Sequence, residues 1–210
     1  MIAAFITAAK PKPVVCLGIP LRPFCLAHQF SLYEANSAFL RNAVPTLKDL
    51  MIACLICSQD HKGTSDIWND PDLEKDLKFW EKKLRGGFFN RLKPFDFSAD
   101  VLKFKEYLIA GNRFPVVKFE VSANAKESIA PPHLFTLTAL LSRLHLTLDE
   151  SMNIHLPLAR WLVAGYGEQE GQLSIVDSVE FKADKEEANK IYAEEMAKQA
   201  ARKEAAHGCA

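Results

Sequence analysis

The sequence predicts a mainly α-helical protein, built as a single compact domain of about six helices with one or two short extended segments. Three observations lead to this prediction. Apolar residues recur at helical spacing in several long segments, and prolines, glycines and capping residues mark the ends of those segments. Strict apolar–polar alternation is confined to short segments. The chain has 210 residues, of which 49% are hydrophobic, and this is enough for one core.

The N-terminal region predicts an extended arm followed by a helix. Residues 1–20 are apolar but interrupted by prolines and a glycine, so we expect an extended arm with a short strand near residues 13–17. The first helix is predicted over residues 23–40, because Pro23 suits a first helical turn. Its apolar residues form two stripes, and such a wide apolar surface indicates deep burial or a partner.

The second helix is predicted to lie at the centre of the core. Thr46 and Asp49 have the spacing of a capping box, and they follow a proline that ends the preceding segment. Residues 50–57 are apolar on nearly every side, which is typical of a helix that is covered all round. Residues 58–69 are polar and are predicted to form a surface loop.

The third helix carries the clearest boundary signals. Asp70 is a capping residue, Pro71 occupies the first helical position, and a pair of glycines at 86–87 ends the segment. Its apolar stripe is separated from a face rich in lysine and acidic residues. The stripe consists of Leu73, Leu77, Trp80 and Leu84.

The second half of the chain predicts three more helices and two extended segments. The helices are expected over residues 98–110, 133–146 and 157–170. Residues 117–121 alternate in polarity and residues 173–176 are apolar, so both are predicted to be extended. A lone strand is not stable. We therefore expect these segments to pair in a small sheet, or a partner strand to come from the N-terminal segment or another subunit.

The domain organisation is predicted to be simple. Residues 1–182 form the helical domain with its extended N-terminal arm. Residues 183–210 are rich in alanine, glutamate and lysine, with a thin apolar stripe, so they are predicted to form a projecting helix or a tail.

Charge and cysteine content narrow the class of protein. Lysine plus arginine number 26, as do aspartate plus glutamate, so no basic surface for nucleic acid or anionic membrane is indicated. Near-zero charge does not oppose self-association into a homo-oligomer. The five cysteines are an odd number, and the N-terminus lacks the basic start of a signal peptide. We expect a cytoplasmic protein with reduced thiols.

The candidate chemical groups do not combine into a catalytic, cofactor-binding or metal-binding site. Cys54 and Cys57 form a CxxC pattern, but it lies late in an apolar helix, where burial disfavours the thiolate. A zinc site needs a second pair of ligands, and His61 is the only nearby candidate. His28 is interpreted as a hydrogen-bonded helix residue, and His145 and His155 as loop residues. The sequence therefore predicts a protein that is not an enzyme.

The first helix is the surface predicted to bind a partner. Its apolar residues outnumber those that one core-facing stripe requires. The residues predicted to contact the partner are Leu26, Phe30, Tyr33, Phe39 and Leu40.

Three segments together carry a resemblance to a known class of protein. They are LGIPLRPFCLAH at residues 17–28, DLMIACLICS at residues 49–58, and LPLARW at residues 156–161, which is followed by EQEG at residues 168–171. In this order the chain resembles uncharacterised proteins from the structural-gene clusters of tailed bacteriophages and prophages, some of which are similar to tail assembly chaperones. The match covers about half of the chain and contains no catalytic signature.

The resemblance implies a small, helical, non-enzymatic protein of the host cytoplasm that binds a phage tail protein, such as the tape measure, during assembly. Two alternatives remain open at this point. One is a minor structural subunit of the virion, in the tail or the connector. The other, which the position of the CxxC disfavours, is a thiol redox protein that uses Cys54 and Cys57.

Overall fold

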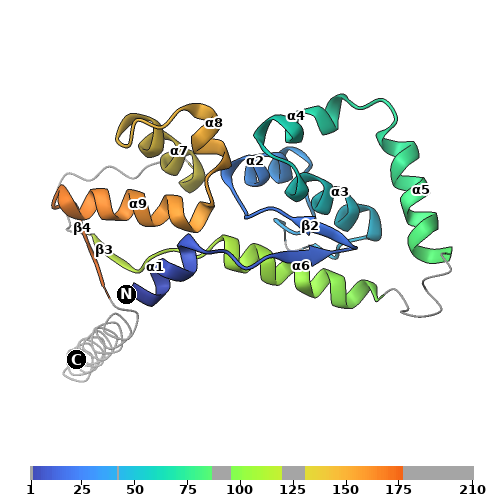
Figure 1. Ribbon diagram of the computed structural model, residues 1–210, viewed down its shortest axis with the longest axis horizontal. Helices are drawn as coiled ribbons and strands as arrows, with labels where there is room; N and C mark the ends of the chain where they lie inside the picture. Colours follow the sequence, from blue (N-terminus) through green and yellow to red (C-terminus); the bar gives the residue numbers. More distant parts are fainter. Residues whose placement is uncertain (1, 42, 87–95, 120–130, 177–210) are drawn as a thin grey trace, which may run out of the picture.

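A computed structural model of the protein describes residues 2–41, 43–86, 96–119 and 131–176 (Figure 1). These residues form nine helices and four short strands, so the predicted mainly helical class is confirmed, with more helices than the six expected. The helices are α1 (Ile2–Ala9), α2 (Leu26–Glu34), α3 (Leu47–Ser58), α4 (His61–Asn69), α5 (Leu73–Gly86), α6 (Phe97–Gly111), α7 (Pro132–Ser142), α8 (Leu148–Asn153) and α9 (Leu156–Gln169). The strands are β1 (Val14–Cys16), β2 (Ile19–Leu21), β3 (Val117–Phe119) and β4 (Leu173–Ile175).

Helix α3 lies at the centre of the core, as predicted. It contacts α2, α4, α5, α6 and β2, and its residues Leu50, Cys54 and Cys57 have no exposed surface. The predicted capping box is present, because the Asp49 N–H donates to Thr46 Oγ1 while the Thr46 N–H donates to Asp49 Oδ2. Surrounding elements therefore cover most of the helix, with Ile52 and Leu55 half-buried, which explains why it is apolar on nearly every face.

The four strands form two separate antiparallel pairs. Strands β1 and β2 make a hairpin in which Cys16 is opposite Ile19, and its turn consists of Leu17 (φ 51°) and Gly18 (φ 77°). Two successive residues with positive φ are the signature of a tight hairpin turn, and a glycine supplies one of them. Strands β3 and β4 pair with Val117 opposite Ile175. The two predicted extended segments therefore pair with each other.

The prediction of a wholly extended N-terminal arm is wrong. Residues Ile2–Ala9 form helix α1, which packs against α9 (Figure 1). The ring of Phe5 meets the ring of Trp161 edge to face, with centroids 5.9 Å apart. An alanine-rich segment has a high helix propensity. Because α9 covers one side of it, this eight-residue helix is stabilised by tertiary packing, and Pro11 follows its end.

The predicted surface loop at residues 58–69 is also wrong, because most of it forms helix α4. The Asp60 carboxylate caps this helix by accepting a hydrogen bond from the Gly63 N–H at 2.9 Å. Only Thr64 is buried among its residues, and the helix is short and polar on average, so it lacks the long apolar stripe by which the other helices were predicted. Contacts with α2, α3 and α8 stabilise a helix that the apolar pattern alone does not reveal.

Several predicted helices are present with different ends. Helix α2 begins after Cys25 and ends at Glu34, so it is shorter than predicted, and Asn36 at φ 51° breaks the helical path. The helix predicted over residues 133–146 ends at Ser142. A further helix, α8, was not predicted, although Thr147 and Glu150 form its capping box. Helices α3, α5, α6 and α9 match their predictions to within about two or three residues. The predicted C-terminal helix or tail at 183–210 lies outside the described residues.

Candidate functional site: an apolar cleft beside a buried arginine

A cleft of about 760 Å³ opens where α1, the C-terminal end of α6 and the start of α9 meet. Its walls are mainly apolar. Five of the residues that line it are charged, and all five are exposed to solvent. The apolar walls include Ile6, Ala8, Val14, Phe24, Phe114 and Trp161. The charged residues are Lys10, Lys12, Lys103, Arg113 and Glu106, so bases outnumber acids.

Two hydrogen bonds and one close packing contact hold the walls of the cleft. His155, at the start of α9, donates from Nδ1 to the carbonyl of Ala8 in α1 at 2.7 Å. On the opposite wall, the Tyr107 hydroxyl donates to the carbonyl of Arg22 at 2.8 Å. Beside it Gly111 lies directly against the ring of Phe24. Burial lowers the pKa of His155, which keeps the ring neutral with its proton on Nδ1.

Gly111 should be required for the packing of this wall. A Cβ atom at position 111 would lie 2.5 Å from Cβ of Phe24, which is far inside van der Waals contact. We expect Gly111→Ala to lower the free energy of unfolding by about 2 kcal/mol, measured by urea denaturation. Gly165→Ala is the matched control, since nothing lies within 4 Å of its added Cβ. That variant should gain up to about 1 kcal/mol from helix propensity. Equal stability of the two variants would contradict the packing argument.

The five residues predicted to bind a partner do not lie on one exposed surface. Leu26 is fully buried and Phe39 packs on Phe104, with ring centroids 4.7 Å apart. Phe30 and Leu40 are half-buried against the core. Only Tyr33 is well exposed, at 51%. Leu26 is therefore unavailable to a partner in this structure, and a role for the others stays a prediction.

Tyr33 and Phe30 belong to an aromatic cluster that the sequence did not reveal. His133, at the start of α7, stacks on the Tyr33 ring with centroids 5.1 Å apart and meets the Phe30 ring edge to face at 5.0 Å. Burial, and then the charge of Arg160, lower the pKa of His133. The cluster thus joins α2 to α7. His133 also lies close enough to Arg160 in α9 for the charge of the guanidinium to lower its pKa.

Arg160 is the one charged side chain among the described residues that is buried in the core. It is 5% exposed, and its Nε and Nη1 atoms have no hydrogen-bond acceptor. Its Nη2 donates to Asn112 Oδ1 at 3.3 Å, and its Cζ lies 3.7 Å from the centre of the Phe114 ring. Burial lowers the pKa of Arg160 to about 10, so the guanidinium remains protonated at neutral pH.

The thiols of the CxxC pattern are buried, as the sequence predicted. Burial raises the pKa of Cys57, and for Cys54 a hydrogen bond with the Cys16 thiol is the largest cause of a raised pKa, followed by burial. The neighbour of Cys54 is thus a cysteine of the hairpin, which the local spacing did not indicate. Because thiol reactivity depends on the thiolate, these positions disfavour redox chemistry at this pair.

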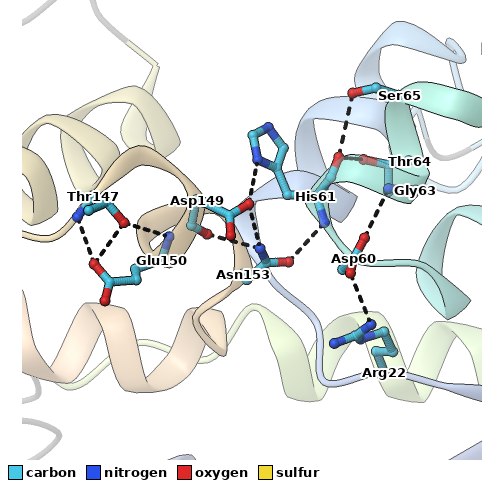
Figure 2. Close-up of polar contacts among 10 residues, drawn as sticks. All are labelled: Arg22, Asp60, His61, Gly63, Thr64, Ser65, Thr147, Asp149, Glu150 and Asn153. Atoms are coloured by element: carbon cyan, nitrogen blue, oxygen red, sulfur yellow. Dashed lines mark hydrogen bonds and ion pairs between the residues drawn. The ribbon is translucent and has the colours of Figure 1, made fainter.

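His28 and His61 take part in hydrogen bonds between elements. His28 is buried and donates from Nε2 to the carbonyl of Gln59. His61 contacts Asp149 Oδ1 through Nδ1 at 3.3 Å, and its backbone N–H donates to Asn153 Oδ1 (Figure 2). The hydroxyls of Thr64 and Ser65 point to the backbone carbonyl of His61 rather than to its ring (Figure 2). This network therefore joins α4 to α8. The described residues contain no group of three or more potential metal ligands.

Comparisons with known proteins were made at the level of families, curated proteins and solved structures. No family model matches the chain, and no curated protein or solved structure matches it either. Among the residues that the structure describes, no helix has the length and apolar character needed to cross a membrane.

Proposed function

We propose that the protein is a non-enzymatic binding protein that receives an apolar helical segment of a partner in the cleft between α1, α6 and α9. Following the resemblance in its sequence, we propose the role of a phage tail assembly chaperone, whose partner is a tail protein such as the tape measure. The observation that supports this most is the cleft itself, because its walls are apolar and it is open to solvent. Exposed apolar grooves of this kind bind the apolar faces of helices.

The surface around the cleft extends the apolar area beyond its walls. Ile6 of α1 is 50% exposed and Phe114 is 58% exposed, and both line the cleft. Phe5, also on α1, is 40% exposed outside the cleft, and its ring contacts that of Trp161, which lines the cleft, so the apolar surface continues past the walls. A partner helix would place its apolar side chains against these residues, while acidic residues on its flanks would face Lys10, Lys12 and Arg113.

The test of this proposal is binding of a phage tail tape-measure protein encoded in the same genome. Co-expression and pull-down should recover a complex with the wild-type protein. Ile6→Asp introduces a charge into the apolar surface, so it should weaken binding at least tenfold, measured by isothermal titration calorimetry with the purified partner segment.

Val44→Asp provides the matched control, because Val44 is 92% exposed and does not line the cleft. It should bind like the wild type. If no tail protein forms a complex, the proposed function is wrong; if Ile6→Asp binds normally, the cleft is not the binding surface. Mass spectrometry of purified particles separates the chaperone, which should be absent from them, from a minor virion subunit, which should be present.

A further inference from the structure

The guanidinium of Arg160 is buried without a counter-charge. Within the part of the chain that the structure describes it forms no ion pair, and its Nε and Nη1 atoms have no acceptor. Its one hydrogen bond, to Asn112 Oδ1, is long at 3.3 Å. Buried cations are normally paired with an anion, because transferring an unpaired charge from water into a protein is unfavourable. An unpaired buried guanidinium with unused N–H groups therefore has the charge and the hydrogen-bond donors that an anion-binding site requires.

The position of Phe114 provides a route to this group. The ring covers the guanidinium at 3.7 Å, yet it is largely exposed and also lines the cleft. Phe114 belongs to the segment between α6 and β3, where no helix or strand restrains its backbone. A ligand in the cleft would therefore reach Arg160 by moving this ring aside.

We propose that Arg160 and Asn112, beneath Phe114, form a binding site for a carboxylate group. A carboxylate is a planar monoanion that accepts two parallel hydrogen bonds from a guanidinium. One such group neutralises one arginine, whereas a phosphate dianion would leave an excess negative charge, because the described residues place no second buried cation beside Arg160. The donors it would use are the unpaired N–H groups on Nε and Nη1.

The experiment measures thermal stabilisation by sodium acetate, with sodium chloride replacing it to hold the ionic strength constant. Acetamide is the neutral isostere. The wild-type melting temperature should rise by about 3–5 °C once acetate is roughly tenfold above its dissociation constant, and acetamide should have no effect. In parallel, NMR titration should show that acetate raises the pKa of His133, because it neutralises the nearby charge of Arg160.

Three variants locate the effect. Arg160→Met removes the charge and should abolish the acetate response. Asn112→Asp places a carboxylate next to the guanidinium and should abolish the response while the charge of Arg160 remains. Arg143→Met is the matched control, since Arg143 is exposed with its Cζ 5.9 Å from the centre of the Tyr166 ring, and it should respond like the wild type.

Three results would overturn the proposal. They are no difference between acetate and chloride, an undiminished response in Arg160→Met, and stronger stabilisation by phosphate than by acetate.

Binding of two model peptides distinguishes a carboxylate on a partner protein from a free carboxylic acid. Only this peptide experiment rests on the proposed function. One is an apolar helical peptide with a single central glutamate, and the other carries glutamine in its place. At least tenfold tighter binding of the glutamate peptide assigns the site to a partner's side chain. Equal binding of the two peptides, together with a response to acetate, assigns it to a free carboxylic acid, and the carboxylate site stands even if no tail protein binds.

Discussion

Lowering the pH from 7 to 4 should reduce the free energy of unfolding by about 3 kcal/mol through His28 alone. Burial lowers the pKa of this histidine from 6.5 to about 4 in the folded protein. Below pH 6.5 the unfolded chain therefore binds a proton that the folded protein does not accept until about pH 4. The contribution of His28 to stability is complete above pH 6.5 and is lost progressively as the pH falls to about 4.

The geometry around His28 explains why its ring remains neutral. Its Nε2 donates to the carbonyl of Gln59 at 2.8 Å, and its Nδ1 accepts a hydrogen bond from the backbone N–H of Cys25 at 3.4 Å. A second proton, on Nδ1, would face that N–H group and break the contact at the start of α2. Protonation therefore adds the loss of a helix cap to the cost of placing a charge in the core.

Urea denaturation between pH 4 and pH 8 measures this effect. His28→Gln should lower stability at pH 7 by about 1–3 kcal/mol, because the ring's packing and hydrogen bond are lost, but it should flatten the acid dependence. Some dependence should remain, since the pKa values of His133 and His155 are also lowered in the folded protein. The exposed His145, changed to glutamine, is the control and should keep the wild-type profile. An equally steep profile in His28→Gln would refute the assignment.

The sequence predicted those elements whose evidence is local. Thr46 with Asp49 marks the start of α3, and the apolar residues of α3 place it in the core. Two of the three missed helices, α4 and α8, were also marked locally, by Asp60 three residues before Gly63 and by Thr147 three residues before Glu150. They were missed because short helices stabilised by caps and tertiary contacts lack a long apolar stripe.

The candidate site depends on contacts between residues far apart in the chain, and these have no local signal. Phe24 meets Gly111 only when the segment before α2 packs on α6, and Arg160 meets Asn112 and Phe114 only when α9 packs beside the end of α6. One local hint existed. Arg160 lies between Ala159 and Trp161 in an apolar segment, where a charged residue indicates either a buried pair or a functional site. The choice between a buried ion pair and a functional site depends on whether the fold places an acidic side chain beside Arg160.

Replacing Arg160 with methionine should increase the free energy of unfolding by about 2–3 kcal/mol at pH 7 in chloride buffer. Methionine retains much of the volume of arginine and removes an unpaired charge, whose burial costs several kcal/mol. The variant loses the contact with the Phe114 ring and one long hydrogen bond to Asn112, which together offset part of this gain, roughly 1–2 kcal/mol. Urea denaturation measures the difference. Arg143→Met, at an exposed position, should change stability by less than about 0.5 kcal/mol.

A loss of stability in Arg160→Met would show that the guanidinium is a structural group, and the reason for regarding it as a receptor would disappear. The same comparison in acetate completes a thermodynamic cycle. Because acetate binds only the folded wild-type protein, the stability advantage of Arg160→Met should shrink by the amount that acetate stabilises the wild type. A charged residue that destabilises the free protein, and ceases to do so when a carboxylate is bound, has the energetic behaviour of a binding site rather than of a core residue.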